Sequence, residues 1–434
     1  MKVLVVGGGG REHAICWKLA QSEKVDEIFC APGNAGIAKV AECVAVGAED
    51  IDGICGFAKE NDIDLAVIGP EVPLAMGIVD ELEAAGVKTF GPNKKCSQLE
   101  ASKSFTKDFL ARHQIPTAGY KEFTDKQELL DAVGIFGYPM VLKADGLAAG
   151  KGVVIAENEA DAKKAIEEMM GDKVFGHAAD KIVVEEFLTG VEASMLCFVD
   201  ENTILPMESA QDYKRAFDDD KGPNTGGMGT YSPSLLFDEK IEDEIRSQIL
   251  EPTLAGFQKD GLDFKGVLFI GLMLSEDGPK VIEFNNRFGD PETQSVLARL
   301  ESDLAEVFLA VTENRLAEVE LKWKKEKAVC VVLASGGYPG SYEKGKLISG
   351  LGNVDPDVIV FHAGTKFAEM PEGSKCAGCE MKQSAIVTSG GRVLGVTALG
   401  KTHEEARAKA YANAEKITFD GVQYRKDIGL IHRG

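Results

Sequence analysis

The sequence predicts a mixed α/β and α+β protein made of three units. Strand-like and helix-like segments alternate through residues 1–102, which is typical of a doubly wound parallel sheet. A glycine-rich loop near residue 146 joins two strand-like segments inside a compact α+β stretch. A charged break at 323–327 precedes further strand-like runs and a helix. The 434 residues suffice for about two to four domains, so we expect units at 1–102, 103–322 and 323–434.

Composition excludes several classes of protein. Hydrophobic residues make up 44% of the chain and charged residues 27%, as in water-soluble globular proteins. The net charge of −22 is opposite in sign to that of most nucleic-acid-binding proteins. No apolar run approaches the roughly 18 residues of a membrane span. The nine cysteines are odd in number, which indicates reduced thiols. We therefore expect a cytoplasmic monomer with no nucleic-acid or membrane partner.

Periodicity gives the expected elements of each unit. The first should hold strands at 2–6, 27–30, 43–46, 65–68 and 88–90 and helices at 11–21, 52–61 and 74–85. The second should hold helices at 103–112 and 160–170 and strands at 138–143, 152–156, 181–187, 192–199, 266–274 and 280–284, with a small subdomain at about 115–190. The third should hold strands at 328–333, 358–363, 384–389 and 393–399 and a helix at 404–416.

The first strand runs into four glycines, Gly7–Gly10, and then into a helix. Such a helix start offers free N–H groups and a positive dipole end to an anion. The dinucleotide fingerprint G-x-G-x-x-G is not met, because Glu12 stands at the third glycine position. The pattern thus disfavours NAD and leaves either a phosphate site or a plain tight turn. Loops at Gly33–Asn34 and at Glu71 should converge with it, since ligands bind beyond the carboxyl ends of parallel strands.

A second glycine loop, Gly146–Gly152, follows the strand that carries Lys143. It lacks the spacing and the hydroxyl of a Walker A loop. It can instead fold over a triphosphate, with Lys143 and Lys151 supplying charge; the alternative is a surface hairpin. The next apolar strand leads to Glu192, which could meet ribose hydroxyls or simply belong to a loop.

Period-2 alternation places Glu283, Asn285 and Arg287 on one face of a strand. Carboxylate and amide oxygens suit Mg²⁺, and an arginine can stabilise the charge that develops during phosphoryl transfer. A satisfied ion pair is the alternative. Two polar stretches, 211–215 and 222–229, have the composition of a lining for a small charged substrate or of a disordered surface loop.

The order of these segments resembles the phosphoribosylamine–glycine ligase family of the ATP-grasp superfamily. The resemblance rests on KADGLAAGKGV, VVEEFLTGVEAS, GPNTGGMG and VIEFNNRFGDPETQ, and continues through GGYPGSYEKG, FHAGTK, SGGRVLGVTALG and YRKDIG to the end of the chain. It implies a central ATP-grasp fold with a lid at about 115–190. It also implies that ATP phosphorylates glycine and that the amine of 5-phosphoribosylamine attacks the glycyl phosphate. The products are glycinamide ribonucleotide, ADP and phosphate, in de novo purine (IMP) synthesis.

The resemblance also implies roles for particular residues. Those expected to bind ATP are Lys103, Lys143, Gly146, Gly150, Lys151, Gly152, Glu185, Glu186, Phe187, Leu188 and Glu192. Those expected to hold Mg²⁺ or Mn²⁺ are Glu283 and Asn285. Those expected to bind substrate are Gly9, Gly10, Arg11, Gly33, Asn34, Glu71, Asn224, Gly226 and Gly227. Those expected to act in catalysis are Asp212, Lys214 and Arg287. The division of glycine and phosphoribosylamine contacts among them stays open.

Two departures and three rival functions accompany this interpretation. Residues 266–274 contain no acid, so a third protein ligand for the metal stays open. Residues 371–382 look like an insertion carrying Cys376 and Cys379, which is half a zinc site; we expect a thiol-bearing loop. The rivals are another ATP-grasp carboxylate–amine ligase, a biotin-dependent carboxylase, and an NAD oxidoreductase or non-catalytic nucleotide sensor. Met381-Lys382 is followed by Gln383, so no biotin-carrier motif is present.

Overall fold

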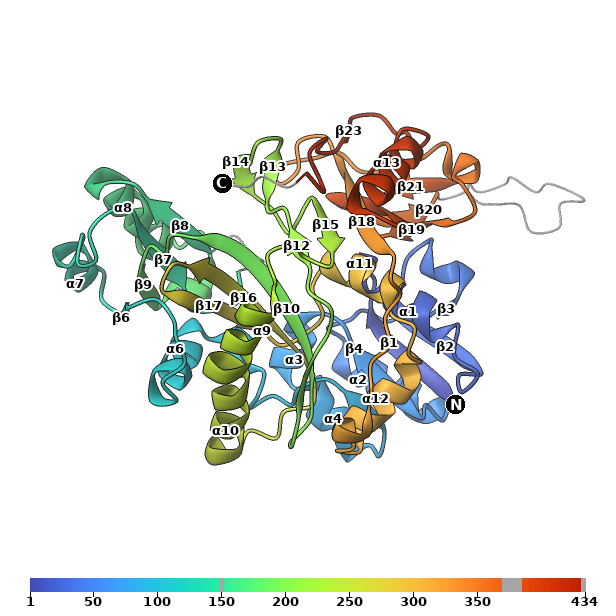
Figure 1. The fold of residues 1–434 in the computed structure, drawn as a ribbon, viewed down its shortest axis with the longest axis horizontal. Helices are drawn as coiled ribbons and strands as arrows, with labels where there is room; N and C mark the ends of the chain where they lie inside the picture. Colours follow the sequence, from blue (N-terminus) through green and yellow to red (C-terminus); the bar gives the residue numbers. More distant parts are fainter. Residues whose placement is uncertain (149–151, 369–384, 431–434) are drawn as a thin grey trace, which may run out of the picture.

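The N-terminal region forms a parallel sheet covered by helices on both faces, in blue in Figure 1. The computed structural model describes residues 1–148, 152–368 and 385–430. The strand order is β3-β2-β1-β4-β5, with β1 (Lys2–Gly7), β2 (Glu27–Pro32), β3 (Glu42–Cys43), β4 (Leu65–Ile68) and β5 (Lys88–Phe90). Val3 and Val5 pack in the core with α1 (Gly10–Leu19), whereas Leu4 and Val6 pack with α2 (Ile51–Glu60). The predicted doubly wound parallel sheet is confirmed.

Two expected elements of this sheet differ in the structure. The predicted helix at 74–85 is two helices, α3 (Glu71–Met76) and α4 (Ile78–Ala84). Gly77 separates them with φ of 100°, a left-handed conformation that ends one helix and starts the next. The predicted strand at 43–46 is the short edge strand β3, which ends at Cys43.

The second region holds a small antiparallel sheet in the order β6-β9-β7-β8. Its strands are β6 (Tyr120–Phe123), β7 (Met140–Ala144), β8 (Val153–Ala156) and β9 (Ile182–Glu186). Helices α7 (Lys126–Asp131) and α8 (Glu159–Ile166) pack on it, α8 continues into a π-helical turn at Glu167–Gly171, and a 3-10 turn spans Gly176–Ala179. This is the predicted lid subdomain; β6 and α7 were not predicted. Residues 149–151 of the glycine loop lie outside the described residues.

A larger antiparallel sheet forms the middle of the molecule, in the order β11-β10-β16-β17. Its strands are β10 (Val191–Val199), β11 (Ile204–Pro206), β16 (Gly266–Ser275) and β17 (Gly278–Asn285). Helices α5 (Gln98–Ala101), α6 (Lys103–Arg112), α9 (Glu239–Ile245) and α10 (Glu251–Asp260), with a π-helical turn at Arg246–Leu250 between the last two, share one core with it. Alternate residues of β10, such as Leu196 and Phe198, point to the other face, where α12 (Leu304–Thr312) and the N-terminal sheet pack.

The C-terminal sheet recruits strands from the central stretch of the chain. Its order is β12-β15-β18-β22-β19, with β23 also paired to β18. These are β12 (Gln211–Asp212), β15 (Gly229–Ser232), β18 (Lys327–Ser335), β19 (Val358–His362), β22 (Arg392–Gly400) and β23 (Val422–Gln423). Two ribbons, β13 (Arg215–Phe217) with β14 (Lys221–Asn224) and β20 (Thr365–Phe367) with β21 (Ile386–Thr388), flank the sheet, and α13 (His403–Ala414) covers it. Short 3-10 turns occupy Ile37–Lys39, Leu316–Glu318 and Leu351–Asn353.

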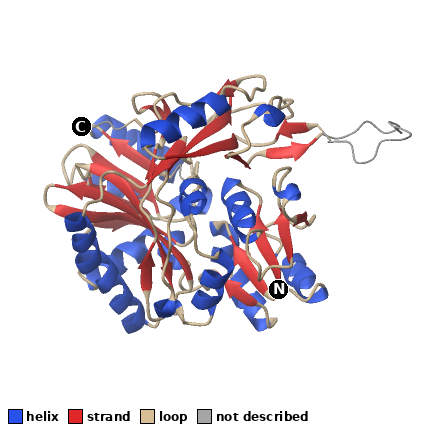
Figure 2. Cartoon of the chain, turned by 45° about the vertical axis from the view of Figure 1, so that its right-hand side comes forward, coloured by secondary structure: helices blue, strands red, loops and turns tan. Residues whose placement is uncertain are grey.

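Helix α11 (Glu292–Arg299) joins the regions, because it contacts α1 on one side and β15, β18 and β22 on the other. Figure 1 shows it between the N-terminal sheet and the C-terminal sheet, and Figure 2 shows that helices and sheets pack against one another throughout the described parts of the chain. All eight of its residues are buried. Within the described ranges, no helix is long and apolar enough to cross a membrane. The seven described cysteines are free thiols; Cys376 and Cys379 fall in 369–384, outside the described residues.

An aromatic cluster fixes the N-terminal sheet to the central region. Phe308 of α12 is fully buried, and its ring centroid lies 4.0 Å from that of Phe90 and 6.1 Å from that of Phe288. We expect Phe308→Ala to lower the free energy of unfolding by about 3–5 kcal/mol, because it removes a ring and leaves a cavity. Urea unfolding followed by tryptophan fluorescence measures this, since Trp17 and Trp323 pack against the same core.

Phe367→Ala is the matched control. That ring is 44% exposed, so its loss should change the free energy of unfolding by about 0.5 kcal/mol or less. Equal unfolding midpoints for Phe308→Ala and Phe367→Ala would contradict the structural role given to the cluster.

Candidate active site

A cleft of about 610 Å³ lies between the lid sheet, the central sheet and the β12–β14 segment. It collects most of the residues predicted from sequence. Those that line it are Lys103, Lys143, Gly146, Gly152, Glu185, Glu186, Phe187, Leu188, Glu192, Asp212, Lys214, Glu283, Asn285, Arg287, Glu71, Asn224 and Gly226. Gly150 and Lys151 lie outside the described residues. Residues that were predicted separately to bind phosphate, to bind a metal ion and to act in catalysis therefore line one cleft.

The end of β17 presents Glu283 and Asn285 to the cleft, as the period-2 pattern predicts. The amide nitrogen of Asn285 lies 3.4 Å from a Glu283 carboxylate oxygen. Burial alone would raise the pKa of Glu283, but Lys214, Lys103 and Lys143 outweigh it and lower that pKa to about 2. An ionised carboxylate beside an amide oxygen fits a hard divalent cation. No described part of the chain gathers three or more His, Cys, Asp or Glu groups suited to a metal.

Arg287 follows on the same strand end and binds two acids. Its Nη2 lies 3.1 Å from a Glu100 carboxylate oxygen, and its Nε lies 3.4 Å from a Glu71 oxygen. A second Glu100 oxygen accepts the backbone N–H of Asn286 at 2.7 Å. Glu100 was not predicted, because nothing in a short helix marks one acid as the partner of a distant strand. The arrangement fixes the guanidinium at the edge of the cleft.

Lys107 is a further residue that sequence reasoning missed. Its Nζ lies 3.0 Å from one oxygen of Glu185, and Lys143 Nζ lies 2.9 Å from the other. All three side chains are buried, so each oxygen of the Glu185 carboxylate is paired with a lysine inside the protein. Burial, offset in part by Glu185, lowers the pKa of Lys107 to about 8. The signal in the sequence was its position one helical turn after Lys103.

Three acidic residues surround one lysine in the cleft. The lysine is Lys214, and the acids are Asp212, Glu192 and Glu292. Lys214 Nζ lies 3.3 Å from a Glu192 oxygen, so Glu192 is paired as well as placed in the cleft. Burial raises the pKa of Asp212 and that of Glu292, and each carboxyl is an electrostatic neighbour of Lys214. Glu292, at the first position of α11, was not predicted.

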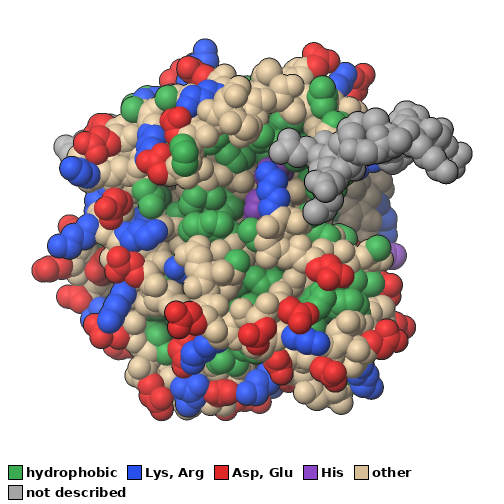
Figure 3. All heavy atoms as spheres, turned by 90° about the vertical axis from the view of Figure 1, so that its right-hand side faces the viewer, with side chains coloured by type: hydrophobic (Ala, Val, Ile, Leu, Met, Phe, Trp, Pro, Cys, Tyr) green, Lys and Arg blue, Asp and Glu red, His purple; other side chains and the backbone are tan. Residues whose placement is uncertain are grey.

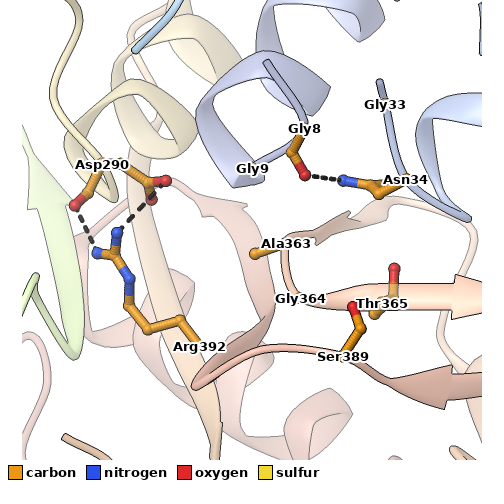
Figure 4. Close-up of a pocket in the computed structure, with 10 residues that line it drawn as sticks. All are labelled: Gly8, Gly9, Gly33, Asn34, Asp290, Ala363, Gly364, Thr365, Ser389 and Arg392. Atoms are coloured by element: carbon orange, nitrogen blue, oxygen red, sulfur yellow. Dashed lines mark hydrogen bonds and ion pairs between the residues drawn. The ribbon is translucent and has the colours of Figure 1, made fainter. Parts of the chain in front are cut away.

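A second cavity of about 340 Å³ lies between the N-terminal loops and the C-terminal sheet (Figure 4). Of the predicted substrate residues, Gly9, Gly33 and Asn34 line it. The unpredicted lining residues are Gly8, Asp290, Ala363, Gly364, Thr365, Ser389 and Arg392. Asp290 also lines the larger cleft, so the two cavities share a wall.

Three predicted substrate residues line neither cavity. Arg11 is buried, and its guanidinium donates to a Glu12 oxygen at 2.5 Å and to the Phe288 carbonyl at 3.1 Å. A Cβ on Gly10 would meet Gln294, and a Cβ on Gly227 would meet Pro291. The N–H of Gly9, expected to face a phosphate, donates to Glu12 at 2.6 Å. Glu12 therefore satisfies the helix start from within the chain.

Comparison with known proteins agrees with this geometry. Three domain families described as phosphoribosylglycinamide synthetase match the chain: the N domain at 1–100, the ATP-grasp (A) domain at 101–293 and the C domain at 328–431. A phosphoribosylamine–glycine ligase of Caldanaerobacter subterraneus subsp. tengcongensis is 50% identical over 428 residues, covering 99% of each chain. One of Vibrio vulnificus is 49% identical over 433 residues, covering 99% of this chain and 98% of that one.

Solved structures give the same result. The crystal structure of phosphoribosylamine–glycine ligase from Thermotoga maritima matches with a TM-score of 0.81 and 33% identity, over 99% of this chain and 100% of that one. The biotin carboxylase domain of a Hydrogenobacter thermophilus 2-oxoglutarate carboxylase matches with a TM-score of 0.70 and 17% identity, over 98% and 91%. The second likeness concerns the ATP-grasp fold alone. By sequence and by structure, the chain belongs to the phosphoribosylamine–glycine ligase family.

Proposed function

We propose that this protein joins glycine to 5-phosphoribosylamine with ATP, giving glycinamide ribonucleotide, ADP and phosphate in purine synthesis. The family supports the reaction. The observation that carries it is the wall shared by the two cavities at Asp290. One cavity holds the lysines and oxygen ligands that suit ATP with a divalent cation. The other is open to a second substrate, so the two can meet at the boundary.

In this proposal, different residues of the larger cleft bind the triphosphate, the base, the cation and the glycine. Lys103 and Lys143 supply positive charge to the triphosphate, and the backbone of Glu185–Leu188 faces the base. Glu283 and Asn285 would hold Mg²⁺, or Mn²⁺ in its place, which would neutralise phosphate charge during transfer. Arg287, held by Glu71 and Glu100, would stabilise the charge on the carboxylate of glycine as it becomes an acyl phosphate. The lid sheet covers the cleft and would exclude water from that intermediate.

Release of ADP with different substrates separates this function from a carboxylase. Purified protein with ATP and Mg²⁺ should form ADP only when glycine and phosphoribosylamine are both present. ADP formation that depends on bicarbonate instead would assign the chain to a different ATP-grasp activity.

Glu283→Gln tests the cation site. The change keeps the size of the side chain but removes a charge that the neighbouring lysines stabilise. We expect kcat/KM to fall by at least ~100-fold, about 2.7 kcal/mol, with the circular dichroism spectrum unchanged. Glu276→Gln, at an exposed position in the turn before β17, is the control and should keep wild-type kinetics. Wild-type turnover of the Glu283→Gln variant in Mg²⁺ would contradict the assignment of Glu283 as a ligand of the cation.

Glu292→Gln tests the buried acid. Because burial and Asp212 raise the pKa of Glu292, the folded protein keeps a proton that the unfolded chain loses above pH 4.5. Wild-type stability should therefore fall as pH rises through this range, at up to ~1.4 kcal/mol per pH unit from this group. Glutamine carries no such proton, so the stability advantage of the variant should grow from pH 6 to pH 8 in urea unfolding.

The exposed Glu60→Gln is the control for this measurement and should show no pH-dependent difference from wild type. A stability difference between Glu292→Gln and wild type that stays constant from pH 6 to pH 8 would show that Glu292 is already ionised in the folded protein.

A further inference from the structure

The smaller cavity has a distinctive charge arrangement. Among the described residues that line it, Arg392 is the one cation and Asp290 the one anion. Both stand at one end of the cavity in Figure 4, and Thr365 and Ser389 stand on the opposite wall from Gly8, Gly9 and Asn34. A phosphorylated substrate that enters this cavity therefore has one guanidinium to meet.

The side-chain donors of the N-terminal wall and the N–H of Gly9 are already bonded within the protein. The Gly9 N–H is taken by Glu12, and the Arg11 guanidinium is taken by Glu12 and by the Phe288 carbonyl. The Asn34 amide group donates to the carbonyls of Gly8 and His362, both at 2.9 Å. Its amide oxygen accepts two backbone N–H groups. This wall supplies shape to the cavity, because glycines allow close approach, but little charge.

The C-terminal wall has side-chain donors that the described residues leave free. Arg392 Nη1 donates to the carbonyls of Gly226 and Asp290, both at 2.6 Å. Nη2 lies 3.4 Å from the Asp290 carboxylate, which is a loose contact, and no described residue accepts from Nε. Ser389 likewise has no hydrogen-bond partner for its hydroxyl in the described ranges, and Figure 4 shows that hydroxyl turned up toward the cavity. The Nε–Nη2 edge of a guanidinium matches two phosphate oxygens.

We propose that Arg392 of the C-terminal sheet and Ser389, which directly follows β21, hold the phosphate of the amine substrate, with the Asp290 carboxylate accepting from its sugar. The proposal rests on the proposed function for the identity of that substrate, a ribosyl amine 5-phosphate. It moves the phosphate from the Gly7–Arg11 loop, where sequence placed it, to the opposite wall. It also gives the C-terminal region a direct part in substrate recognition. Asp290 then places the sugar at the boundary with the larger cleft.

Calorimetric titration with ribose 5-phosphate and with ribose tests the assignment without turnover. We expect Arg392→Gln to weaken binding of ribose 5-phosphate by ~30-fold, which is the range of a lost charged hydrogen bond. Ser389→Ala should weaken it by ~5-fold, as for a neutral hydrogen bond. Neither change should alter the weak binding of ribose or the KM for ATP.

Arg407→Gln is the matched control. Arg407 lies on α13 and, like Arg392, donates to two backbone carbonyls, those of Ile428 and Lys426, but it lines neither cavity. Its replacement should leave the affinity for ribose 5-phosphate unchanged. Loss of affinity in this variant equal to that in Arg392→Gln would overturn the proposal, because general loosening of the C-terminal region would then explain both.

Three other outcomes decide the matter. Unchanged affinity for ribose 5-phosphate in Arg392→Gln would return the phosphate to the N-terminal wall. Equal losses for ribose and ribose 5-phosphate, with a raised KM for glycine, would show that Arg392 acts only by holding Gly226. Wild-type protein that binds ribose 5-phosphate through Arg392 but forms no ADP from ATP, glycine and phosphoribosylamine would support the phosphate site and overturn the proposed function.

Discussion

The site depends on the ion pairs of Arg287. This guanidinium ties the end of β17 to Glu100 of α5 and to Glu71, which follows β4 of the N-terminal sheet. Removal of the arginine would leave the buried Glu100 carboxylate and the half-buried Glu71 carboxylate without their shared partner, which costs more than the ion pairs contribute. Because Glu283 and Asn285 precede it on the same strand, their position relative to the N-terminal sheet is set through Arg287. One residue thus fixes the register between the nucleotide side and the side of the second substrate.

The cleft contains a cluster of positively charged lysines, although the chain as a whole is strongly negative. The net charge is −22, yet Lys103, Lys143 and Lys214 gather around Glu283 strongly enough to lower its pKa despite burial. On the face in Figure 3, acidic and basic side chains of the described residues are interspersed rather than segregated. Attraction of a polyphosphate therefore rests on groups inside the cleft, where screening by salt is weaker than at the surface. Glu185, between Lys107 and Lys143, keeps that positive charge from being unpaired when no ligand is bound.

Sequence patterns predicted the features that depend on residues close together along the chain, such as the face of a strand on which a side chain lies. Period-2 alternation placed Glu283, Asn285 and Arg287 together, and the alternation of strand-like and helix-like segments predicted the parallel sheet. Contacts between distant segments could not be predicted this way. The pairing of Lys107 with Glu185 needs α6 to lie beside β9, and the second cavity needs residues near 290, 363 and 390 to meet the loops at 8 and 33. The prediction for the first glycine loop failed to include a contact within the chain. The sequence predicts that its N–H groups are free to bind an anion, but the N–H of Gly9 donates to the carboxylate of Glu12, three residues away.

Helix α11 explains how two cavities can be held at a fixed distance. It begins beside Asp290, which lines both, and runs buried between α1 and the C-terminal sheet. At its end, Arg299 donates to Ser232 of β15 and to the Glu326 carbonyl, so the helix is anchored both to β15 and to the 323–327 break that leads into β18. A buried helix with polar residues at both ends tolerates little sliding, because every shift would leave a polar group without its partner. Arg392 also contacts the carbonyl and carboxylate of Asp290, so the start of the helix is tied to the C-terminal sheet, whereas the lid sheet packs around its own separate core.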